Sequence, residues 1–168
     1  MSRKRDGVAV VTLRPQEATI VDAVIREVAR AIEADDLDAD VRSRLFPRAY
    51  LDPTEESAEQ DWQSLVHDDL SRERIEALRA ISRDIVDAPN EKGAVVIRLD
   101  AEQEARWLTA LNDVRLMLGT ALHVGPDGQI DDTDDGAPEL YAFLMELQDE
   151  LVELMLAALP ETGEDDPV

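Results

Sequence analysis

The stretch that decides the fold is LDAEQEARWLTALNDVRLMLGTALHV, residues 99–124, in which the end of a strand runs into a helix. Asp100 is a good N-cap, and Gln103 three residues later completes a capping box with it. An apolar row follows at spacings of four, three and four, typical of a helix that lays one face on a core: Trp107, Leu111, Val114 and Leu118. Gly119 is either the C′ glycine that ends this helix or a close-packing point inside a longer one. The pattern predicts the core helix of the fold at 100–120.

Two polar residues lie beside this apolar row, Asn112 and Arg115. One interpretation makes them a ligand-binding pair. The other makes them a structural polar core, in which Arg115 forms an internal salt bridge and Asn112 caps a backbone group. We favour the structural interpretation because buried charges are normally paired. A small-molecule or metal-ion pocket near Arg115, Asn112 and His123 stays open as the alternative.

Two short segments rich in β-branched residues predict strands at 8–13 and 94–99. Because each precedes a helical pattern, we expect the two strands to pair in a small two-stranded sheet. Pro15 marks the start of the first helix, whose apolar positions run to about Glu33.

Further helices are expected on both sides of the second strand. Thr54 is the expected N-cap of a short helix through Leu65, and Ser71 of a separate helix that ends near Ala88. Pro138 opens the last helix, whose leucines repeat at spacings of four and three; its expected core residues are Leu144, Leu147 and Leu151. The fold class is mainly α (α+β), with about five helices around the helix at 100–120.

A chain of 168 residues is long enough to bury one proper core. We divide it into a flexible N-terminal arm at 1–6, a single mostly helical domain at 7–159 and a disordered acidic tail at 160–168.

The charge is unevenly distributed along the chain. The net charge is −22, all 17 Lys and Arg lie at or before Arg115, and residues 116–168 hold 14 of the 39 acids. Phosphate binding needs positive charge, so we expect no direct binding to nucleic acid. The balance favours a protein partner with a basic surface.

Several other classes are excluded by composition. There is no Cys, which removes disulfides, thiolate metal sites and cysteine catalysis. No apolar run is long enough to span a membrane, and the N-terminus has no apolar signal region. We therefore expect a cytoplasmic protein.

No motif indicates catalysis or a cofactor. The acidic loop at 125–136 resembles a calcium loop, but the position that needs a bidentate Glu falls on Ala142. His67 and His123, the two histidines, have no partner at metal-ligand spacing. No nucleophile elbow, P-loop or dinucleotide fingerprint occurs. We expect no enzyme activity, no catalytic or metal residues and no cofactor.

Basic and aromatic side chains interleave in one place: Arg42, Arg44, Phe46, Arg48 and Tyr50. This composition can stack on bases, but it is also enriched where proteins dock. The arginines could equally pair with the protein's own carboxylates while the two aromatic side chains fill the core. These five are the candidate partner-binding residues.

Three segments carry a family resemblance: LFPRAYLDP (45–53), DWQSLVHDDLSRERI (61–75) and RWLTALNDVRLMLGTAL (106–122). They resemble the actinobacterial domain-of-unknown-function family that includes the oxidative-stress regulator AosR. The resemblance implies a cytosolic regulator that works through protein contacts, with a sigma factor or another RNA polymerase component as partner, and no enzyme activity. Redox sensing of the AosR type is attributed to a cysteine pair, which this chain lacks.

The sequence therefore predicts a non-enzymatic regulatory protein without a cysteine switch. Its basic partner would bind the acidic C-terminal third or the segment Phe46–Tyr50. A homodimer joined through the leucine-rich last helix is compatible with this function.

Overall fold

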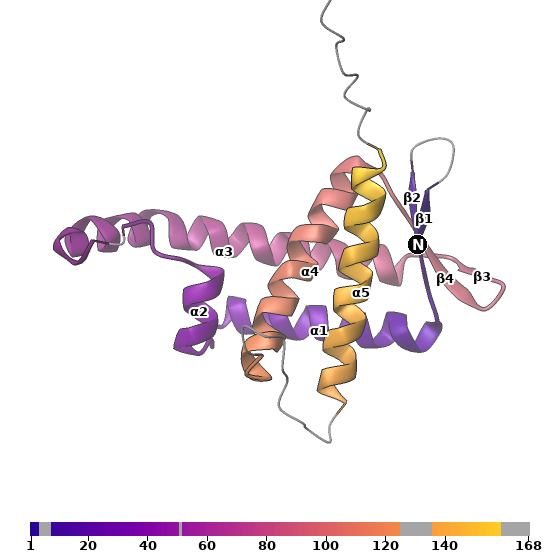
Figure 1. The fold of residues 1–168 in the computed structure, drawn as a ribbon, viewed down its shortest axis with the longest axis horizontal. Coiled ribbons are helices and arrows are strands. Elements are labelled where there is room, and N and C mark those ends of the chain that lie inside the picture. Colours follow the sequence, from indigo (N-terminus) through magenta and orange to yellow (C-terminus); the bar gives the residue numbers. More distant parts are fainter. Residues whose placement is uncertain (4–7, 51, 125–135, 159–168) are drawn as a thin grey trace, which may run out of the picture.

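The computed structural model describes residues 1–3, 8–50, 52–124 and 136–158. It is mainly helical with a small antiparallel sheet, as predicted (Figure 1). The elements follow one another in this order: β1 (Ser2–Arg3), β2 (Ala9–Leu13), α1 (Pro15–Glu33), α2 (Ala39–Leu45), the 3-10 turn η1 (Pro53–Glu55), α3 (Glu56–Val86), β3 (Asn90–Glu91), β4 (Ala94–Leu99), α4 (Ala101–Ala121) and α5 (Ala137–Leu156).

The sheet has the strand order β1-β2-β4-β3. The predicted pair is confirmed: β2 and β4 run antiparallel, with Val11 opposite Ile97. Two strands of two residues each add to this pair. β3 joins β4 through a tight turn in which Lys92 and Gly93 both have positive φ, the conformation that favours glycine.

The predicted flexible arm at 1–6 needs correction where it is described. Ser2 pairs with Val10 and Arg3 with Ala9, so these residues form β1 instead of a loose arm. A two-residue strand has no alternation pattern by which its sequence could announce it. Residues 4–6 and the predicted tail at 160–168 lie outside the described residues.

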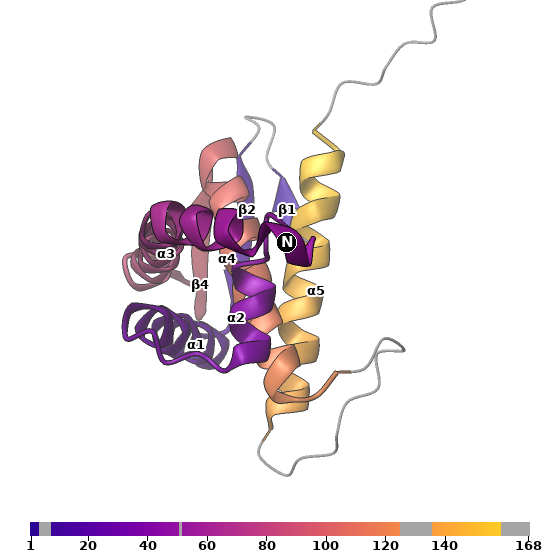
Figure 2. The same ribbon diagram turned by 90° about the vertical axis from the view of Figure 1, so that its left-hand side faces the viewer.

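The helices form layers. α1 and α3 lie side by side, α4 crosses them, and α5 packs on the opposite side of α4 (Figures 1 and 2). The capping box at the start of α4 is confirmed, since the Gln103 amide donates to Asp100 Oδ1 over 2.9 Å and the Asp100 amide to Gln103 Oε1 over 3.0 Å.

Six of the seven predicted core residues are buried: Trp107, Leu111, Val114, Leu144, Leu147 and Leu151. The seventh, Leu118, is half-buried and packs against the core. Gly119 is a close-packing point, because a Cβ there would come within 3.1 Å of the Tyr141 ring on α5. The leucine row of α5 therefore faces α4 within the same chain.

The prediction of two helices at 54–65 and from Ser71 is wrong. A single helix, α3, runs through Ser71 and has 31 residues, which corresponds to a length of about 46 Å. It is preceded by η1, whose cap is Asp52: its carboxylate accepts the Thr54 amide over 2.9 Å.

Candidate functional site

The candidate segment from Arg42 to Tyr50 does not form one open face. Phe46 is buried in the core, whereas Arg44 and Tyr50 are exposed. Arg42 pairs with Asp35 over 2.6 Å, and Arg48 with Glu56 over 2.6 Å. Two of the three arginines, Arg42 and Arg48, thus pair with the protein's own carboxylates.

A buried charge pair lies directly behind this segment and joins α3 to α4. The Arg74 guanidinium donates to Asp113 and also to the Leu45 carbonyl oxygen, over 2.7 Å for the second bond. It also lies 5.5 Å from the centre of the Phe46 ring, at the distance of a cation–π contact. Asp113 is 1% exposed, and this burial raises the pKa of its carboxyl group, although Arg74 opposes the rise.

Arg74 and Asp113 thus form the buried polar contact that we expected from Arg115 and Asn112. Both of those residues are half-buried. Within the parts of the chain that the structure describes, none of the ion pairs involves Arg115. The buried sector of α4 is wider than one apolar row because α3 and α5 cover different sides of it.

The start of α3 is tied to the segment by a buried carboxylate, Glu59. It accepts the backbone N–H groups of Ala49 and Tyr50 over 3.0 and 2.8 Å, and the Gln63 amide over 2.8 Å. These bonds favour the charged form, so the pKa of Glu59 is lowered, with the Tyr50 amide as the largest cause and the charge of Arg48 as a lesser one.

The first half of α3, residues 56–70, is here called the α3 projection. It reaches past α2 and away from α4 and α5 (Figure 1). Glu59 is its one buried residue. Leu65 is 75% exposed, while Trp62 and Val66 are half-buried. The projection therefore presents apolar side chains that the rest of the described chain leaves uncovered.

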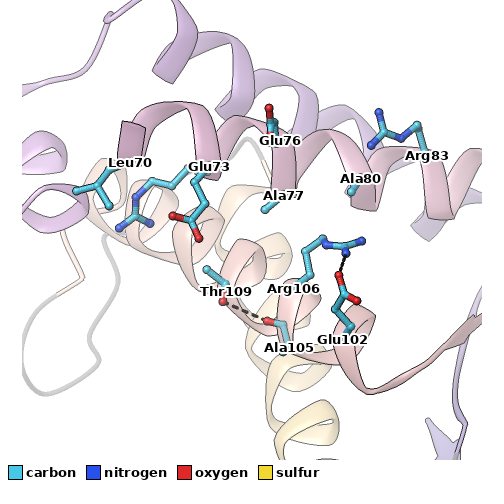
Figure 3. A pocket seen from close by; sticks show the side chains of 11 residues that line it. Leu70, Glu73, Glu76, Ala77, Ala80, Arg83, Glu102, Ala105, Arg106 and Thr109 are labelled. Carbon is cyan, nitrogen blue, oxygen red and sulfur yellow. Dashed lines mark hydrogen bonds and ion pairs between the residues drawn. The ribbon is translucent and has the colours of Figure 1, made fainter. Parts of the chain in front are cut away.

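A groove of about 650 Å³ lies between the second half of α3 and the start of α4 (Figure 3). Alanines and Thr109 are among its lining residues, and its charged lining residues comprise three arginines and three glutamates: Arg74, Arg83, Arg106, Glu73, Glu76 and Glu102. Arg106 pairs with Glu102 over 2.8 Å. Asn112, Arg115 and His123 do not line this groove, so it is not the alternative pocket expected near them.

The outward face of α5 carries a row of exposed acids: Glu139, Glu146, Asp149, Glu150 and Glu153. No Lys or Arg follows Arg115 in the sequence, so α5 contains no basic residue. Met145 and Leu156 are exposed on the same helix.

The described residues also bear on metal binding and on membrane insertion. Among the residues that the structure describes, no group of three or more His, Cys, Asp or Glu side chains is arranged to hold a metal ion. Within the same ranges, no helix has both the length and the hydropathy needed to cross a membrane. The acidic loop that we compared with a calcium loop lies outside these ranges, except for Gly136.

The family described as a domain of unknown function, DUF2017, matches residues 1–155. The chain belongs to the DUF2017 family. Neither the curated proteins nor the solved structures contain a match to it. The DUF2017 match covers both the α3 projection and α5, but it assigns no chemistry to either.

Proposed function

We propose that this DUF2017 protein is a non-enzymatic regulator that acts by binding a protein with a basic surface. The observation that carries the proposal is the outward face of α5, which exposes five carboxylates on a helix without any Lys or Arg. Glu150 pairs with the amino group of Met1, which leaves the other four carboxylates of this row for a partner. Charge of one sign on a rigid helix steers a partner of opposite charge toward it and fixes its orientation.

Of the two surfaces that we expected to bind the partner, we propose the acidic C-terminal one. We expected either the acidic C-terminal third or the segment Phe46–Tyr50 to bind the partner. Phe46 is buried and Arg48 is paired with Glu56, so this segment offers less than its sequence suggested. The five acids of α5 are exposed, although Glu150 also pairs with the amino group of Met1.

The resemblance to the AosR family supports a partner in transcription. A sigma factor or another RNA polymerase component is the partner that it implies, and the regulation would work without a cysteine switch because the chain has no cysteine. A partner that binds nucleic acid also offers basic surfaces, which fits the charge of α5.

The experiment is affinity capture by the full chain from a lysate of its source organism, at low and at high salt. One variant neutralises α5 at three positions: Glu146→Gln, Asp149→Asn and Glu153→Gln. A matched variant removes the same number of charges from exposed carboxylates elsewhere: Glu73→Gln, Glu76→Gln and Asp87→Asn. We expect the wild type and the matched variant to retain a transcription component at low salt, and the α5 variant to lose it.

Two results would count against the proposal. If no transcription component is retained under either salt condition, the proposed function is wrong. If both variants lose the partner equally, net charge alone attracts it and α5 is not the binding surface.

A further inference from the structure

The α3 projection has the composition of a docking surface, with apolar anchors at its centre. Leu65 is the most exposed of the large hydrophobic side chains in the part of the chain that the structure describes. Trp62 lies three residues before it, one helical turn away, so the two side chains are neighbours on the helix surface. Tryptophan is among the residues that contribute most to binding energy at protein interfaces.

The projection is held in place before any partner arrives. Glu59 fixes its inner face to the backbone of Ala49 and Tyr50 through two hydrogen bonds. The His67 ring lies 4.6 Å from the Phe46 ring, which is part of the core. A surface that is already ordered loses less conformational entropy on binding than a flexible segment does.

The charges around Leu65 define the chemistry of the partner. Three carboxylates, Asp61, Asp68 and Asp69, lie three or four residues from Leu65 along the helix and are exposed. Arg72 pairs with Asp69 over 2.7 Å. The net charge around the anchor is thus negative, and a second copy docked through this same surface would bring like charges together.

We infer that the α3 projection is a docking surface for a basic amphipathic segment of a partner protein. An apolar residue of that segment would cover Leu65 and Trp62, and its Lys or Arg side chains would meet the surrounding aspartates. The choice of a basic partner rests on the proposed function, but the surface differs from α5 and can be tested separately.

The probe is a synthetic amphipathic peptide of leucine and lysine, about 14 residues or four helical turns long. Binding to the full chain is followed by the fluorescence of Trp62, with Trp62→Phe as the control that removes this signal. Trp107 is fully buried, so its emission serves as a constant background. We expect a saturable blue shift of the emission as the peptide covers Trp62.

Two matched variants locate the binding, and isothermal titration calorimetry measures their affinities. We expect Leu65→Ser to weaken binding about tenfold or more, as the loss of an interface anchor does. Val86→Ser removes an apolar side chain that is 59% exposed at the opposite end of α3, and we expect it to leave the affinity unchanged. Circular dichroism verifies that both variants remain folded.

Three outcomes would overturn the inference: equal affinity of Leu65→Ser and wild type, equal weakening by Val86→Ser, or equal binding of a lysine–serine peptide of the same charge. Sedimentation of the chain without peptide measures its oligomeric state and provides a fourth outcome that would overturn the inference. If the wild type is a dimer and Leu65→Ser is a monomer, the occupant is a second copy. Because both variants lie outside α5, failure here leaves the proposed function standing.

Discussion

The two halves of α3 are parts of one continuous helix, but different forces hold them. The second half, residues 71–86, buries Leu78 and Ile81 completely against the core. The α3 projection buries one side chain, the carboxylate of Glu59, and is attached by hydrogen bonds and an ion pair. Burial of a leucine contributes about 2 kcal/mol, whereas an exposed ion pair contributes at most about 1 kcal/mol.

This difference separates stability from recognition along a single helix. The second half stabilises the domain, because Leu78, Ile81 and Ile85 are buried in the core and are not available to a partner. The projection contributes little to the core and keeps its apolar surface in solvent. The two halves should therefore respond in opposite ways to mutation, and the following predictions test that contrast.

The largest effect is expected in the second half. Leu78→Ala removes a fully buried side chain and leaves a cavity among well-packed neighbours. We expect a loss of about 2–5 kcal/mol in the free energy of unfolding, measured by urea denaturation. A loss below about 1 kcal/mol would show that this half of α3 is not part of the stabilising core.

The next effect is expected from the buried charge pair. Arg74→Met leaves Asp113 buried without its counter-charge, so we expect the free energy of unfolding at pH 7 to fall by about 3 kcal/mol. Arg72→Met is the matched control on the same helix, because Arg72 forms an exposed pair with Asp69; its effect should stay within about 0.5 kcal/mol. Equal effects of the two variants would show that Arg74 contributes no more than a surface arginine.

These contrasts explain which parts of the fold were predictable from sequence. The start of α4 was predicted correctly because its capping box, Asp100 and Gln103, is local and its apolar row is regular. The predicted boundary between two helices at Ser71 was wrong because the α3 projection lacks an apolar row of its own. The absence of Gly and Pro from 54 to 88 was the available signal for one continuous helix.

The site was less predictable than the fold. Arg74 and Asp113 are 39 residues apart, and with 17 basic and 39 acidic residues the sequence offers many equivalent pairings. Only the crossing of α3 and α4 selects this one. The role of Glu59 could not be predicted either, because nothing in the sequence distinguishes it from the other glutamates. Its hydrogen bonds with the Ala49 and Tyr50 amides depend on the fold.

Acid is expected to loosen the projection but not the second half of α3. The pKa of Glu59 is lowered in the folded state, so its contribution is present above the unfolded pKa of about 4.3 and is lost as the pH falls through the folded pKa. The pKa of Asp113 is raised, so acid has the opposite effect there and favours the folded state.

The measurement for this prediction is an NMR titration of the Ala49 and Tyr50 amide signals below pH 5. Both signals should shift together as Glu59 takes up a proton and its hydrogen bonds weaken. Glu59→Gln should abolish the shared transition, because glutamine does not titrate. If the transition persists in this variant, another carboxylate holds the segment.

The smallest effect is expected at the most exposed anchor of the projection. Leu65→Ala removes apolar surface that is 75% exposed and leaves no cavity. We expect the free energy of unfolding to change by no more than about 0.5 kcal/mol, in contrast to the same substitution at Leu78. Urea denaturation of both variants compares their free energies of unfolding. The same substitution, leucine to alanine, is made once in each half of α3. A loss at Leu65 that approaches the loss at Leu78 would mean that the projection is covered in solution, and the contrast between the halves would no longer hold.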